Sequence, residues 1–109
     1  MSKTSKRRPA RSERRAAERR SEREIADRLK LAALEVGGAP DRPIVVESAS
    51  LVEPTAASMP CARCGERVRV EEHAARSIAG VSLRVVTVRC PTCGHSRAVH
   101  FRVVVASPN

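Results

Sequence analysis

The chain contains four cysteines, and they are arranged as two copies of one short motif. Residues 61–65 read CARCG and residues 90–94 read CPTCG, with 25 residues between the second and third cysteines. Two residues between cysteines allow one turn to present both sulfur atoms to a single ion. The glycine after each pair can adopt the positive φ that points backbone N–H groups at sulfur. The pattern therefore predicts a metal site formed by Cys61, Cys64, Cys90 and Cys93.

The amino-acid composition explains why a small fold here needs such a site. Phe101 is the single aromatic residue among 109, so a core built from Val, Leu, Ile and Ala is thin and needs a further constraint. No segment approaches the stretch of about 18 apolar residues that spans a bilayer. Residues 2–24 also lack the apolar segment of a signal peptide. We therefore expect a cytoplasmic protein, in which paired cysteines favour metal over disulfides.

The residues around the two motifs have the pattern of an antiparallel sheet. Three segments are alternating or rich in β-branched residues, as strands are: residues 66–73, 81–89 and 97–105. Residues 74–80 interrupt this pattern and end in Gly80, so we expect them to form the connection of a hairpin. A strand out and a strand back return the chain to the first motif, which brings all four cysteines together. Phe101 lies in an apolar row of the last strand and is expected in the core.

Two such motifs on matched strands resemble the zinc-ribbon superfamily over residues 59–106. The resemblance implies a three-stranded antiparallel zinc ribbon with one structural Zn²⁺ held by the four cysteines. Iron bound as in rubredoxins is the alternative metal, but rubredoxins surround their site with several aromatic residues, so zinc is preferred. Four thiolates around a dication leave a charge of −2, which neighbouring donors must offset. The residues placed to do so are Arg63, Arg67, Arg89 and His95.

Two specific families within this superfamily share part of the pattern. Bacterial ribosomal proteins of the zinc-ribbon type are similar in having a basic tail like residues 2–8, but their cysteine pairs lie closer together. Transcript-cleavage factors are similar in the CPTCGH sequence of residues 90–95 and in carrying an acidic pair. Glu71 and Glu72 are the candidates for that pair, although they precede the predicted turn. The sequence therefore resembles the superfamily and no specific family.

The N-terminal part of the chain is strongly basic. Residues 1–30 contain 12 Lys or Arg and 5 Asp or Glu, whereas residues 31–109 contain 9 and 7. Residues 1–11 predict a disordered tail, and residues 12–36 predict a helix that ends before two glycines. Its C-terminal half carries one apolar stripe: Ile25, Leu29, Ala32 or Ala33, and Val36. Residues 37–58 contain several prolines and short apolar patches at residues 44–46 and 51–52, and they predict a flexible linker with at most one short extended segment. The expected fold is therefore small α+β.

These features favour a non-enzymatic protein that contacts nucleic acid or a ribonucleoprotein or transcription complex. A basic segment of this density is typical of polyanion binding. The candidate contacts are Arg7, Arg8, Arg11, Arg14, Arg15, Arg19 and Arg20. No catalytic set of side chains is evident, no small-molecule substrate is implied, and His73, His95 and His100 are not needed as ligands.

Two other functions fit the same sequence. One is a protein-interaction adaptor that uses the ribbon or the apolar stripe, with the charge serving solubility. The other is a redox sensor in which oxidation of the thiolates ejects the metal.

Overall fold

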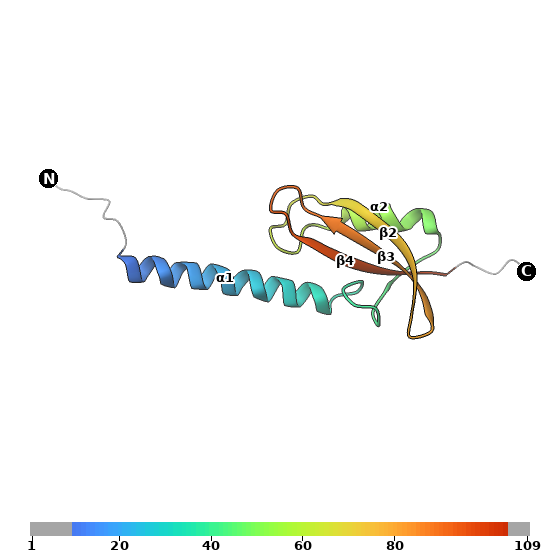
Figure 1. Ribbon diagram of the computed structural model, residues 1–109, viewed down its shortest axis with the longest axis horizontal. Helices are drawn as coiled ribbons and strands as arrows, with labels where there is room; N and C mark the ends of the chain where they lie inside the picture. The colour runs from blue at the N-terminus through green and yellow to red at the C-terminus, as the bar shows by residue number, and fades with distance from the viewer. Residues whose placement is uncertain (1–9, 105–109) are drawn as a thin grey trace, which may run out of the picture.

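The computed structural model describes residues 10–104 as one long helix followed by a small α+β unit (Figure 1). Its elements are α1 (Arg11–Leu34), β1 (Ile44–Val46), the 3-10 turn η1 (Ala49–Leu51), α2 (Val52–Ser58), β2 (Arg69–Ile78), β3 (Val81–Arg89) and β4 (Ser96–Val103). The α+β class matches the prediction. Within the described residues, no helix is long and apolar enough to cross a membrane.

Helix α1 is close to the predicted helix, but it begins one residue earlier and ends two residues earlier. Its N-cap residue is Ala10, which makes no side-chain hydrogen bond to the helix. At the other end, the guanidinium of Arg42 donates to the carbonyl oxygen of Ala33 at 2.8 Å. A Cβ atom on Gly38 would lie 2.3 Å from the carbonyl oxygen of Ala32. The chain can therefore turn this closely against the helix end only with glycine at this position.

The sheet has four strands in the order β1-β4-β3-β2, not the three that the sequence predicts. Strands β2, β3 and β4 pair antiparallel as expected. The additional strand, β1, pairs parallel to β4, with Ile44 opposite Phe101 and Val46 opposite Val103. The sequence Ile-Val-Val favours extended backbone, and the free edge of β4 supplies its hydrogen-bond partners. The prediction of a purely antiparallel sheet is therefore wrong, and the sheet is mixed.

The segment predicted to be a flexible linker, residues 37–58, contains β1, η1 and α2. The hydroxyl of Ser48 caps η1 by accepting a hydrogen bond from the backbone N–H of Ser50 at 3.2 Å. Pro54 is the third residue of α2, where a backbone N–H has no partner within the helix. Proline is therefore compatible with this helix, although the number of prolines in the segment favoured a linker.

The connection between β2 and β3 is shorter than predicted. Strand β2 continues to Ile78, and the turn consists of Ala79 and Gly80 alone. Both residues have positive φ, 52° and 80°, as a two-residue turn that matches the twist of a hairpin requires. The expected connection over residues 74–80 is therefore wrong, because most of these residues continue the strand.

The core lies between one face of the sheet and α2. Val52 and Ala56 of α2 are completely buried, and they pack in one cluster with Val86, Val99 and Phe101 of β3 and β4. The same cluster includes Cys61 and Cys90, so the core is continuous with the cysteine site. Phe101 is in the core, as the sequence predicts.

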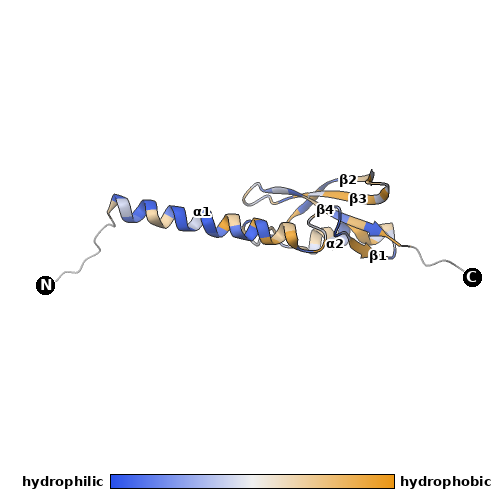
Figure 2. Ribbon diagram, turned by 90° about the horizontal axis from the view of Figure 1, so that it is seen from below, coloured by the Kyte–Doolittle hydropathy of each residue, from blue (hydrophilic) through white to orange (hydrophobic). Residues whose placement is uncertain are grey.

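Helix α1 lies beside this unit and is attached only by its C-terminal half. No residue of α1 is buried, although Ile25, Leu29 and Ala32 are half-buried, and Val36 just beyond it is 61% exposed. The guanidinium of Arg28 donates to the carbonyl oxygen of Arg63 at 3.2 Å. The hydrophilic N-terminal half projects past the end of the sheet (Figures 1 and 2).

Candidate metal centre

The two cysteine motifs fold into the same backbone loop. In each, the N–H of the glycine donates to the carbonyl oxygen of the first cysteine at 2.8 Å. The N–H of that cysteine donates in turn to the residue after the glycine, at 2.8 Å in the first loop and 2.9 Å in the second. Gly65 and Gly94 have φ of 82° and 80°, the left-handed conformation that the repeated glycine predicts. We call residues 61–65 and 90–94 the two knuckles.

The sheet positions the two knuckles at one of its ends. The first knuckle lies between α2 and β2, and the second lies between β3 and β4. Arg69 near the start of β2 pairs with Arg89 at the end of β3, and Cys90 follows Arg89 directly. Antiparallel pairing therefore brings together two loops that are well separated in the sequence.

The four sulfur atoms form one compact group. The Sγ atoms of Cys61 and Cys93 are 3.6 Å apart, and those of Cys64 and Cys90 are 3.5 Å apart. All four lie within 4.8 Å of one another, and all four cysteines are free. A tetrahedral ion with metal–sulfur bonds of about 2.3 Å separates its sulfurs by about 3.8 Å. The arrangement therefore fits one tetrahedral metal ion that links the two knuckles.

Backbone hydrogen bonds favour the thiolate form in the second knuckle. The N–H of His95 donates to Cys93 and, with weaker help from neighbouring groups, lowers the pKa of its thiol to about 6. The N–H of Cys93 is the main cause of the lowered pKa of Cys90. Both shifts occur although desolvation acts in the opposite direction. Thiolates are the form that binds metal, so this knuckle is prepared for binding.

Cys64 in the first knuckle behaves differently. The pKa of Cys64 is raised to about 12. A backbone hydrogen bond from Glu66 lowers this pKa, but desolvation and the three neighbouring cysteines together raise it by more. The cause is that four sulfurs this close cannot all carry a negative charge without a cation between them. The group is therefore complementary to a dication.

Some of the residues expected to offset the charge of the site do contact it. The nearby side chain of Arg63 helps to lower the pKa of Cys93, and the backbone N–H of Arg63 donates to Cys61 Sγ at 3.4 Å. His95 acts through its backbone N–H. The guanidinium of Arg89 lies 3.8 Å from the position of a Cβ atom on Gly94, close to the second knuckle. Arg67 is exposed.

The other candidate residues lie away from the cysteines. The predicted nucleic-acid contacts in the described part of the chain are exposed residues of α1: Arg11, Arg14, Arg15, Arg19 and Arg20. Arg7 and Arg8 lie outside the described residues. His73 is 2.8 Å from Glu53, His100 is 3.1 Å from a backbone carbonyl oxygen, and neither joins the cysteine group.

Arg28 and Arg97 were not singled out from the sequence, although both line hollows beside the first knuckle. Their positions depend on how α1 lies against β4, and no short motif encodes that contact. In the sequence, Arg97 is one of two arginines in a strand that also holds Ser96 and His100, so nothing marks it as a contact.

Comparison with known proteins does not assign a family. No family model matches the chain, and neither a curated protein nor a solved structure is significantly similar to it. The functional interpretation therefore depends on the geometry and chemistry of the chain's own residues.

Proposed function

We propose that this protein is a non-enzymatic zinc-ribbon protein that binds nucleic acid, alone or in a ribonucleoprotein or transcription complex, through its basic N-terminal segment. The observation that carries the first part is the group of four cysteine sulfurs on two matching knuckles. A site with four cysteine ligands has no open position for a substrate or an activated water, so its role is structural. The ion joins α2, β2, β3 and β4 at one end of the sheet.

Zinc is the metal that this site favours. Four thiolates in a tetrahedral arrangement suit Zn²⁺ and also a single iron ion. Phe101 is the only aromatic side chain in the sequence, so the site lacks the aromatic surroundings of rubredoxins. Native mass spectrometry and elemental analysis of the protein purified from its own cells test this choice. One zinc per chain is expected, and a red, iron-containing protein would refute it.

The proposal of nucleic-acid binding is supported by the free arginines of α1. Arg15, Arg19 and Arg23 follow one another at four-residue intervals and so line one face of the helix. Like charges at this spacing repel each other and do not stabilise a helix. None of the salt bridges found among residues 10–104 involves α1. Guanidinium groups without carboxylate partners are available for bidentate contacts with phosphate.

Titration with labelled RNA and DNA of mixed sequence tests this proposal. If all seven predicted arginines contact phosphate, log K for a single strand changes with log[salt] with a slope of about −5. Deleting residues 1–20 is expected to abolish most of the affinity. The test variant removes three charges from α1, and its control removes three charges from the sheet. The test variant carries Arg15→Gln, Arg19→Gln and Arg20→Gln, and the control carries Arg69→Gln, Arg76→Gln and Arg102→Gln. The test variant should weaken binding more than the control. No binding at low salt, or equal effects of the two variants, would contradict the proposal.

A protein-interaction adaptor is the second candidate function, and one observation favours it. Leu31 and Leu34 in the last turn of α1, and Val36 just beyond the helix, are between 61% and 66% exposed. An exposed apolar group of this kind is typical of a surface that docks another protein. Co-purification that survives high salt and nuclease, and that is lost with Leu31→Ser and Leu34→Ser, would favour this function over nucleic-acid binding.

A further inference from the structure

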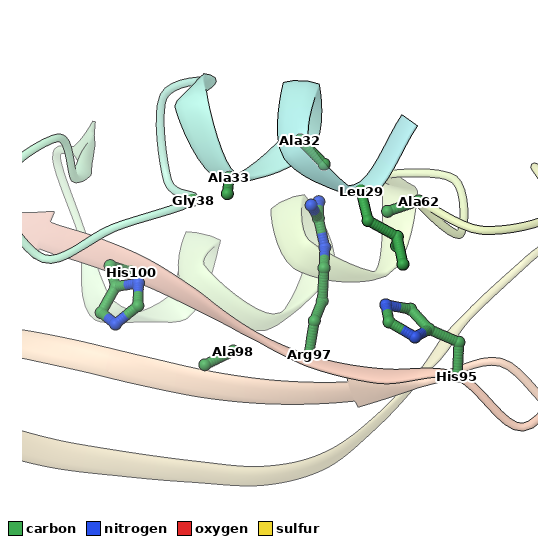
Figure 3. Close-up of a pocket in the computed structure, with 9 residues that line it drawn as sticks. All are labelled: Leu29, Ala32, Ala33, Gly38, Ala62, His95, Arg97, Ala98 and His100. Carbon is green, nitrogen blue, oxygen red and sulfur yellow. The ribbon is translucent and has the colours of Figure 1, made fainter. Parts of the chain in front are cut away.

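A cavity of about 300 Å³ separates the C-terminal half of α1 from β4 (Figure 3). Leu29 and Ala32 of α1, Ala62 of the first knuckle and Ala98 of β4 form its apolar walls. Since α1 buries no residue against the sheet, side chains do not fill this space. Its volume lies at the lower limit of small-ligand sites.

Three polar side chains line this cavity: His100, which is hydrogen-bonded to the carbonyl oxygen of Gly37 at 3.1 Å, and Arg97 and His95. Arg97 extends from β4 towards α1, between Ala32 and Leu29, and His95 points into the same space from the loop before β4 (Figure 3). Among residues 10–104, neither the Arg97 nor the His95 side chain has a hydrogen-bond or ion-pair partner. The half-buried guanidinium of Arg97 therefore has no counterion among these residues and is available to an anion.

The surroundings of Arg97 add further positive charge. A second hollow of about 400 Å³ shares Arg97, Ala32 and Ala62 with the first, and Arg28 also lines it. Arg28 is held in place by its hydrogen bond to the first knuckle. Glu35 is the one carboxylate that lines either hollow, and the metal ligand Cys61 also lines the second. We call this region, with its two hollows on either side of Arg97, the α1–β4 seam.

The distribution of charge along the chain agrees with this local picture. Residues 35–58, which include α2, hold one arginine and four acidic residues, a net charge of −3. Residues 59–104, which form the knuckles and the three long strands, hold eight arginines and three glutamates, a net charge of +5 before the −2 of four thiolates around a dication is counted. Positive charge is therefore present on the knuckles and strands as well as in α1, and the seam lies between these two basic parts.

We propose that the α1–β4 seam is a phosphate-binding site in which Arg97 is the principal contact and His95 and Arg28 lie at its sides. Arginine binds phosphate through two parallel N–H groups, and even a neutral imidazole contributes one N–H donor. The apolar walls shield one side of these contacts from water, which strengthens the attraction between unlike charges. If the bound phosphate belongs to a nucleic-acid backbone, the seam site rests on the nucleic-acid function proposed above. The same site chemistry also accommodates a free phosphate or a mononucleotide.

The variant Arg97→Gln tests the site. Its matched control is Arg102→Gln, since Arg102 lies on the same strand and is exposed. Binding of a fluorescein-labelled 12-mer RNA is measured by anisotropy at two salt concentrations. Arg97→Gln is expected to weaken binding about tenfold and to reduce the salt slope by about one, whereas the control changes affinity less than about twofold. Phosphorus NMR of inorganic phosphate and of AMP, titrated with the same proteins, tests the free ligands.

The outcomes separate this site from the proposed function. Equal RNA affinities of the two variants, with no phosphorus signal perturbed, overturn the seam site but leave binding through residues 1–20 intact. If the wild-type protein does not bind RNA and still broadens the phosphate or AMP signal in an Arg97-dependent way, the site stands and the proposed function fails. If Arg97→Gln lowers only zinc affinity, the arginine serves the metal centre and the proposal is wrong.

Discussion

At the scale of single residues, the two knuckle glycines are constrained by backbone conformation and not by space. A Cβ atom added to Gly65 would meet no atom within 4 Å, although φ is 82°. Gly80 in the β2–β3 turn has the same two properties, with φ of 80°, and lies away from the cysteines. These two positions therefore form a matched pair, in which the backbone strain is similar and only the distance from the metal centre differs.

We predict that Gly65→Ala and Gly80→Ala each destabilise the protein by about 1 kcal/mol, because both force alanine into the left-handed region. Only Gly65→Ala is expected to weaken zinc binding, since it shifts the N–H groups that face the sulfurs. Thermal unfolding and competition with a chromophoric chelator measure the two effects. Equal zinc affinities in the two variants would show that the glycine serves the turn alone.

Zinc affinity is predicted to rise with pH because the metal displaces a proton from Cys64. The pKa of Cys64 is about 12, so this thiol is protonated throughout the neutral range in the metal-free protein. The metal-bound state carries fewer protons, and log K should therefore increase by at least about one per pH unit between about pH 6.5 and 8. Below the pKa of Cys93, about 6, a second proton competes and the dependence steepens. Chelator competition at several pH values measures this slope, and a flat profile contradicts it.

At the scale of secondary-structure elements, α2 contributes a completely buried side chain to the core, whereas β1 also carries an exposed one. Val52 of α2 is completely buried, whereas Val45 of β1 is 62% exposed. We predict that Val52→Ala costs about 2 kcal/mol, from lost burial and the cavity left behind, and that Val45→Ala costs less than about 0.5 kcal/mol. Denaturant unfolding of the zinc-bound protein compares the two. Similar losses would mean that α2 packs weakly against the sheet.

Removal of residues 1–34 is predicted to leave the metal centre intact. No residue of α1 is buried, so the deletion exposes little of the core. The truncated protein should still bind one zinc, and its unfolding temperature should change by only a few degrees, as expected for a loss of about 1 kcal/mol or less. Loss of zinc binding after this truncation would show that α1 supports the knuckles.

Sequence patterns predicted the elements that are defined by local signals. The paired cysteines and glycines gave the knuckles, and Phe101 in an alternating row was correctly assigned to the core. The apolar patch at residues 44–46 indicated a short extended segment in the linker, but its place in the sheet was missed. Three residues are too few to show a period, and their pairing with β4 is distant in sequence. Arg97 was missed as a candidate contact because its neighbours on α1 are brought to it only by the fold.

At the scale of the whole molecule, the metal is expected to hold the fold together. The buried core is small, it includes Cys61 and Cys90, and Phe101 is its one aromatic side chain. We predict that a strong chelator unfolds the sheet while α1, which is built from strong helix formers, keeps a fluctuating helical content. Near-UV and far-UV circular dichroism, with zinc added back, follow this transition. A metal-free protein with an intact cooperative thermal transition would contradict the prediction.

The parallel pairing of β1 with β4 has a consequence for how the chain is made. During synthesis, residues 44–46 and the first knuckle are made before the second knuckle and β4. Two cysteines hold an ion weakly, and β1 has no neighbour until Phe101 and Val103 have been added. Capture of the ion therefore waits for the second knuckle, and completion of the sheet waits for β4, which follows that knuckle. Until both have emerged, the growing chain presents open thiols and an unpaired edge to the cell's chaperones.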